Sequence, residues 1–127
     1  MSTPDLVAVL LATLVLAGIG AVQVLAAAGR PCGRLVWGGR HEVLPRGLRV
    51  GSALSVPLYA AAVGALLVRA GAWGRSGTEA EVVAWALVGY FAIGIVLNAI
   101  SRSRPERLTM TPACVVLTAC CLVVASG

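Results

Sequence analysis

Hydrophobic residues along the chain are gathered into four long runs without a charged side chain. The runs cover residues 6–28, 50–68, 82–101 and 108–127. About 20 apolar residues in an α-helix are enough to cross the hydrocarbon layer of a bilayer. Because lipid offers no partners to backbone N–H and C=O groups, each run should be a helix that satisfies these groups internally. The pattern therefore predicts an all-α protein, a four-helix transmembrane bundle with a single domain over residues 1–127.

Helix-start signals give the expected boundaries. Thr3 stands before a proline that can occupy the first helical position. Thr78 and Glu81 have the spacing of a capping box, and Thr109 can cap the last helix. The predicted helices are 4–28, 50–69, 79–101 and 109–126, and the loops on one side of the membrane are 29–49 and 102–108. The fourth helix is then short for a full crossing.

Charge is sparse and unevenly distributed. Only 12% of the residues are charged, and the ten basic residues are all arginine. Arginines are concentrated in loops 29–49 and 102–108, whereas neither terminus carries one. Cytoplasmic loops of membrane proteins carry an excess of basic residues. We therefore expect both loops on the cytoplasmic side of a bacterial cytoplasmic membrane, with both termini outside.

Nucleic acid is not an expected partner. Proteins that bind nucleic acid gather basic residues on one folded face, often with aromatic side chains for stacking. Here the arginines lie in the gaps between hydrophobic runs. Membrane lipids are the partner that this arrangement predicts.

Uncharged polar residues near the membrane ends of the helices are candidates for helix packing or for ligand contact. These positions are Gln23, Ser52, Tyr59 and Asn98. Gln23 and Asn98 lie at similar depths, so either can bond across a helix interface, with Ser52 or Ser55 as further partners. Such bonds contribute about 0.6 kcal/mol on average in membrane bundles, so they specify packing more than they drive it. Packing is the favoured interpretation, and a polar lining for a small ligand is the alternative.

The loop 29–49 is rich in Gly, Pro and Arg, yet it also carries Trp37 and several apolar residues. This mixture suits an ordered segment along the inner membrane surface, with Trp37 at headgroup depth and arginines near lipid phosphates. Glu106, in the other loop, can pair with an arginine and join the two loops. The candidate loop and headgroup contacts are Trp37, Arg40, His41, Arg49, Arg102, Arg104, Glu106 and Arg107.

The sequence contains no recognisable catalytic, cofactor or metal site. His41 stands beside Glu42, but adjacent side chains rarely point the same way and no nucleophile accompanies them. None of the cysteines forms a CxxC pair, so neither a zinc site nor a disulfide framework is expected. Small multidrug exporters depend on a glutamate in their first span, and the span 6–28 has no carboxylate. We expect no ionisable side chain at membrane depth.

The loop motif resembles that of a known family. The sequence reads Gly-Arg-Pro-Cys-Gly at 29–33, Trp-Gly-Gly-Arg-His at 37–41, Val-Leu-Pro at 43–45 and Leu-Arg at 48–49. Together with Gln23, Asn98 and Glu106, this resembles a family of small, uncharacterised bacterial membrane proteins with four predicted spans. The resemblance covers most of the chain. It implies the same architecture and carries no function.

Three classes of function follow from these observations. The first is a non-enzymatic membrane protein, either an accessory subunit of a membrane-protein partner or a lipid-interacting module. The alternative is a small transporter or channel that works as a homo-oligomer, with the polar positions and a kink at Pro57 along its pathway. The third is a membrane enzyme that uses His41, Glu42 and Glu106, and it has the least support.

Overall fold

The computed structural model describes all 127 residues and is built from four long α-helices. The helices are α1 (Thr3–Ala27), α2 (Arg46–Ala70), α3 (Thr78–Ala99) and α4 (Arg104–Ser126), and two short 3₁₀ turns, η1 (Gly33–Leu35) and η2 (Trp37–Gly39), lie in the first loop. Each of the four helices is long and apolar enough to cross a membrane. The prediction of an all-α four-helix bundle is confirmed, and the chain is a multi-pass membrane protein by the length and composition of its helices.

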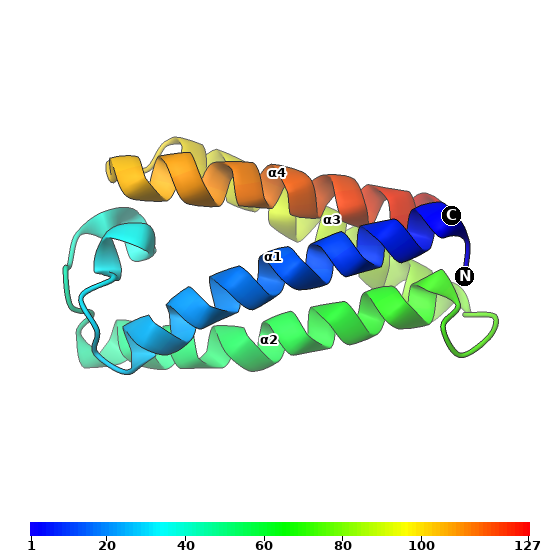
Figure 1. Ribbon diagram of the computed structural model, residues 1–127, viewed down its shortest axis with the longest axis horizontal. Helices are drawn as coiled ribbons and strands as arrows, with labels where there is room; N and C mark the ends of the chain where they lie inside the picture. Colours follow the sequence, from blue (N-terminus) through cyan, green and yellow to red (C-terminus); the bar gives the residue numbers. More distant parts are fainter.

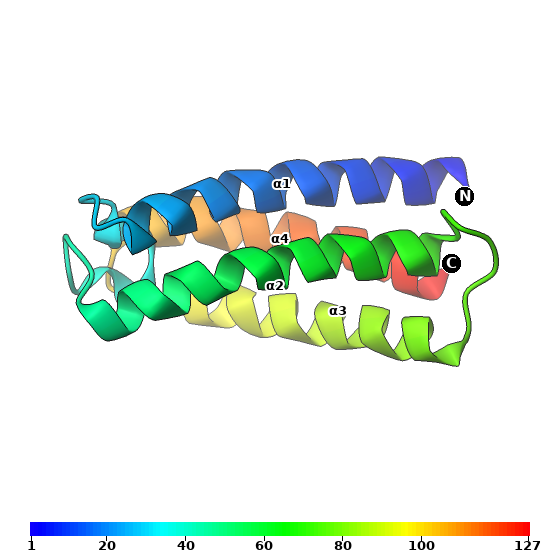
Figure 2. The same ribbon diagram turned by 90° about the horizontal axis from the view of Figure 1, so that it is seen from below.

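The helices run side by side with alternating direction, so the connections fall at two ends (Figures 1 and 2). Both termini and the α2–α3 connection lie at one end, which we call the terminal end. The η1–η2 loop and the α3–α4 turn lie at the other end. This second end, which we call the arginine-rich end, holds every arginine except Arg69 and Arg75.

The packed core lies between α1, α2 and α4 and is strongest toward the terminal end. It is made of small and medium side chains, including the fully buried Leu66, Leu117 and Cys121. Small residues allow helix backbones to approach closely, which is how membrane helices gain packing contacts. Helix α3 packs mainly against α4, touches α2 less, and buries the smallest share of its residues. Helix α3 is therefore the peripheral helix, and its outer face is available to lipid.

Two arginines of α2 hold the ends of neighbouring helices. Arg49 donates its Nε–H to the carbonyl oxygen of Ala27 at 2.9 Å, and Arg69 donates from Nη2 to that of Ala125 at 2.9 Å. Neither α1 nor α4 has a basic residue in its own last turn. The last carbonyls of a helix lack partners within the helix and carry partial negative charge. Helix α2 therefore supplies the missing cation to both.

The observed helix starts correct the predicted boundaries. Helix α2 begins at Arg46, so Arg49 lies in the helix and not in a loop. Helix α4 begins at Arg104, so Glu106 and Arg107 lie in its first turn. With 23 residues, α4 is long enough to cross, and the expectation of a short fourth helix is wrong. The charge-based boundary placed the starts too late because arginine and glutamate are good helix formers that extend helices beyond the apolar run.

The predicted caps are also wrong in detail. Ser2, not Thr3, caps α1, and its Oγ accepts a backbone N–H of the first turn at 3.2 Å. Gly77 precedes α3, so Thr78 is already helical and forms no capping box. Thr109 lies inside α4. A cap depends on which residue leaves the helical conformation, and the residue types alone do not decide this.

Candidate functional site

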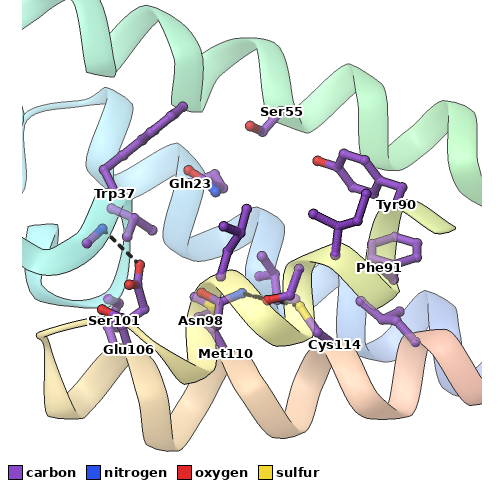
Figure 3. Close-up of a pocket in the computed structure, with 18 of the residues that line it drawn as sticks. Gln23, Trp37, Ser55, Tyr90, Phe91, Asn98, Ser101, Glu106, Met110 and Cys114 are labelled. Atoms are coloured by element: carbon purple, nitrogen blue, oxygen red, sulfur yellow. Dashed lines mark hydrogen bonds between the residues drawn. The ribbon is translucent and has the colours of Figure 1, made fainter. Parts of the chain in front are cut away.

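A cavity of about 440 Å³ lies among the helices in the half of the bundle nearer the arginine-rich end. All four helices and the η1–η2 loop contribute to its wall (Figure 3). Its polar or sulfur-bearing lining residues are Gln23, Trp37, Ser55, Tyr59, Tyr90, Asn98, Ser101, Glu106, Met110 and Cys114. The rest of the wall is mostly aliphatic or aromatic. Ligand sites typically have this volume and this mixture of apolar walls with few polar groups.

The cavity lies where α3 packs closely against α4 and contacts α2 less. Gly94 permits this close packing on α4, since a Cβ at this position would lie 3.1 Å from the Sγ of Cys114. On the α3 side of the cavity, Tyr90, Ile93 and Leu97 are also exposed on the outside of the bundle. The cavity therefore adjoins the lipid-facing flank between α2 and α3, where the two helices make their weaker contact.

Gln23 brings an unsatisfied polar group to the cavity wall. Its side chain is only 8% exposed, and its Nε2 donates to the hydroxyl oxygen of Tyr59 at 3.3 Å. Its Oε1 is enclosed and has no hydrogen-bond partner. Exchanging the two amide atoms would leave the nitrogen in the same position. Nearly all buried polar atoms in proteins are paired, so an unpaired one indicates a missing partner. The unpaired atom of the Gln23 amide can therefore bond to a ligand in the cavity.

Asn98 lines the same cavity without contacting Gln23 through a hydrogen bond. Its Nδ2 donates to the carbonyl oxygen of Gly94 at 2.7 Å and to the Sγ of Cys114 at 3.4 Å. Both residues bond across a helix interface, but Gln23 pairs with Tyr59 and Asn98 with a thiol of α4, and neither pairs with Ser52 or Ser55. The structure brings three of the four polar candidates to one cavity wall.

The fourth polar candidate, Ser52, is a partner of Trp37. Ser52 is fully buried, and its Oγ accepts the indole N–H of Trp37 at 2.9 Å. The ring lies against Gly51, where a Cβ would be 2.8 Å from Cζ2. The side chain of Trp37 reaches toward α2 (Figure 3), while 44% of the residue stays exposed, so its expected place at headgroup depth stays a prediction. Trp37 also has a positive φ of 53°, a backbone conformation that no sequence pattern indicates.

Glu106 is the least expected member of the site. The prediction placed it in an exposed loop, paired with an arginine, whereas it is 5% exposed and lines the cavity. Its Oε2 accepts the backbone N–H of Gly38 at 3.3 Å (Figure 3). The neighbouring Arg107 donates instead to the carbonyl oxygen of Ser101 at 2.8 Å. Glu106 is therefore a buried ionisable side chain at the arginine-rich end of the bundle, before the apolar run of α4.

Residues 103–106 could have indicated this position. Ser103 and Glu106 have the spacing of a capping box directly before an apolar run, which marks a helix start. Neither side chain caps the helix, however, and both reach the first loop. The hydroxyl of Ser103 donates to the carbonyl oxygen of Arg34, and Ser103 also packs so closely on Gly39 that a Cβ there would clash. The two loops are joined, as predicted, but by these contacts in place of an ion pair.

Arginines of both loops surround a separate depression outside the cavity. It has a volume of about 410 Å³ and a wall without hydrophobic side chains. Its lining residues are Arg34, Gly38, Gly39, Arg40, Arg102, Ser103 and Pro105. Gly38 belongs to both walls, so the cavity and the depression are neighbours. The remaining candidates, His41 and Arg104, are exposed and lie outside both linings.

The cysteines are free thiols. Cys114, Cys120 and Cys121 are buried in α4, and Cys32 is half-buried in the first loop. The structure contains no cluster of three or more His, Cys, Asp or Glu side chains that could hold a metal ion. The chemistry of the site therefore rests on Glu106, the amides and the hydroxyl groups of the cavity.

The fold and the cavity define a class of protein: a small four-helix membrane protein with a partly polar cavity among its helices. No protein-family model, curated protein or solved structure matches the chain. The resemblance of the loop motif to a four-span bacterial family stays a prediction.

Proposed function

We propose that this chain is a non-enzymatic integral membrane protein that binds a small amphiphilic molecule from the bilayer. The observation that carries the proposal is the 440 Å³ cavity, whose wall divides into mostly apolar residues and a few polar ones, among them Gln23 and Glu106. An amphiphile matches this division, because its chain can lie on the apolar wall while its polar group meets Gln23 and Glu106. The volume lies within the range of ligand sites for small molecules.

The position of the cavity supports entry from the membrane. Tyr90, Ile93 and Leu97 line it and are exposed on the flank between α2 and α3. A molecule dissolved in the lipid can pass between these two helices without crossing the polar ends. This route suits a ligand with an apolar body, for which the bilayer is already the favourable solvent.

The arginine-lined depression supports a second, weaker interaction with anionic lipid headgroups. Arg34, Arg40 and Arg102 meet there from two loops. Each basic residue near an anionic membrane surface contributes about 1 kcal/mol to membrane attraction. We further propose that this end faces the cytoplasm of a bacterial cell and that both termini lie outside, because basic loops are retained on the cytoplasmic side.

A transporter is the second candidate, and one observation favours it. The cavity and the open arginine-lined depression share Gly38, whose N–H donates to Glu106. A pathway across the membrane would also need a passage through the terminal half, where Leu16, Leu66 and Leu117 form the packed core. The geometry therefore supports binding better than passage.

Filling the cavity tests the proposed function. Ser55 lines the cavity, whereas Ala53 on the same helix is exposed and lies outside its lining. We expect protein purified in gentle detergent to retain a bound amphiphile, detected by native mass spectrometry. Ser55→Phe should lose most of this bound species, because the ring occupies the space, and Ala53→Phe should keep it. Equal retention by both variants would contradict binding in this cavity.

A further inference from the structure

We infer that the ligand's polar group is a cation, a protonated amine, held by Glu106 in a cavity that aromatic side chains also line. This inference deepens the proposed function and rests on it. Glu106 and the unsatisfied amide of Gln23 line one cavity together with Trp37, Tyr59 and Tyr90. A buried acidic group in a cavity that three aromatic side chains also line indicates the chemistry of the ligand more closely than the volume does.

Glu106 carries the first part of the argument. A carboxylate has about four sites that accept hydrogen bonds, and the only donor found for Glu106 is the N–H of Gly38. The amino end of α4 favours negative charge at this position. Burial of a carboxylate is nevertheless costly without further donors or a cation. An ammonium group in the cavity supplies both the opposite charge and the missing donors.

The aromatic lining carries the second part. Ring faces attract cations, and recognition of ammonium ligands by several aromatic side chains is a common use of this attraction. Trp37, Tyr59 and Tyr90 come from the loop, α2 and α3, so they surround the cavity from different sides. The amide of Gln23 lies on the same wall as Tyr59 and bonds to it. It can accept a hydrogen bond from an amine through its unpaired oxygen.

The distribution of arginines excludes an anionic group from the same place. None of the residues that line the cavity is an arginine, and those of the first loop and the α3–α4 turn line the depression on the other side of Gly38. A fatty-acid carboxylate in the cavity would meet Glu106 without a basic partner. Like charges at close range in a partly buried site repel strongly. The cavity should therefore discriminate against anionic amphiphiles.

Chain-matched probes test this inference directly. Octylammonium, octan-1-ol and octanoate have the same chain and differ in the charge of the polar group. The protein carries three tryptophans, so Trp73→Phe with Trp85→Phe leaves Trp37 in the cavity wall as the only fluorescent reporter. Titrations in nanodiscs, corrected by the same titration of the Ser55→Phe form, give the binding constants of the three probes.

We expect octylammonium to bind about tenfold or more tightly than octan-1-ol, and octanoate to bind least, because the charge-assisted bond adds to the shared apolar contact. Glu106→Gln should remove the preference. Glu42→Gln, which neutralises an exposed glutamate outside the cavity lining, should keep it. The order in which the protein with native Glu106 binds the three probes tests the inference even if Glu106→Gln fails to fold.

The outcomes separate the inference from the proposed function. If octylammonium and octan-1-ol bind equally and both are lost in Ser55→Phe, the inference of a cationic ligand group is overturned. The cavity then remains a binding site. A preference for octylammonium that survives in folded Glu106→Gln would also overturn the role of Glu106. Failure of all three probes to change Trp37 emission, together with unchanged lipid retention in Ser55→Phe, would overturn the proposed function as well.

Discussion

The indole N–H of Trp37 donates to the hydroxyl of Ser52 at 2.9 Å, and this bond fastens the first loop to α2. Ser52 is fully buried, so the indole is its partner in an otherwise closed environment. Trp37 adopts a left-handed backbone conformation with φ of 53°, which costs about 1 kcal/mol or more for a residue with a Cβ. The bond and the packing of the ring on Gly51 offset this strain. Trp37 thus forms one wall of the cavity and also holds the loop in place.

A double-mutant cycle on this pair should show strong coupling. Trp37→Phe removes the donor and leaves the Ser52 hydroxyl buried without a partner, which should reduce the free energy of unfolding by about 1–3 kcal/mol. Trp37→Phe with Ser52→Ala should cost less than the sum of the two single changes, because the unpaired hydroxyl is gone. Thermal or denaturant unfolding in detergent measures all four forms. Strictly additive effects would show that the bond does not stabilise the protein.

Gly39→Ala should weaken the junction between the two loops. Gly39 has φ of 70°, and a Cβ there would clash with Ser103 of the α3–α4 turn. We expect a loss of more than about 1 kcal/mol in the free energy of unfolding, because the backbone strain at the positive φ adds to the displacement of Ser103. Gly47→Ala, in α2 with open space around its Cα, is the control and should be neutral or stabilising. The prediction fails if the two substitutions have the same effect.

Arg49→Gln should loosen the last turn of α1. The guanidinium of Arg49 lies against the carbonyl of Ala27, and its loss removes both a hydrogen bond and a cation at a helix carboxyl end. The expected cost is about 0.5–2 kcal/mol. Arg46→Gln removes an exposed arginine of the same helix and serves as the matched control. Hydrogen exchange should be faster at the end of α1 in Arg49→Gln alone, and similar exchange in both variants would contradict this role.

The proposed orientation predicts opposite labelling at the two ends of the bundle. A membrane-impermeant thiol reagent added to intact cells should react with Ser2→Cys near the N-terminus. It should not react with Val43→Cys in the arginine-rich loop until the cells are opened. The native thiols of α4 are buried and contribute little background. Reaction of Val43→Cys in intact cells would reverse the orientation.

A large part of the architecture could be predicted from the sequence. Hydropathy identified four spans, and the structure has four helices that cover those runs to within two residues at each end. This prediction succeeds because the requirement to cross a bilayer acts on each segment separately. The helix starts were less predictable. Arg46, Arg104 and Glu106 are helical although they are charged, because the helices continue beyond the apolar layer.

The polar candidates were predictable as residues, but their roles were not. Gln23, Tyr59 and Asn98 were selected from the sequence, and all three line the cavity. The pairing of Gln23 with Tyr59 depends on the relative rotation of α1 and α2, which hydropathy does not contain. The left-handed conformation of Trp37 likewise reflects contacts with α2 that no local pattern indicates.

The sequence by itself determined the number of helices, their apolar lengths and the concentration of arginines at one end, because each is a property of a continuous segment. Only the tertiary structure decided that Glu106 is buried in a cavity. That position is held by the N–H of Gly38, which lies 68 residues earlier in the chain. Contacts between distant segments follow from how all four helices pack together, and this is why the site became visible only in the folded chain.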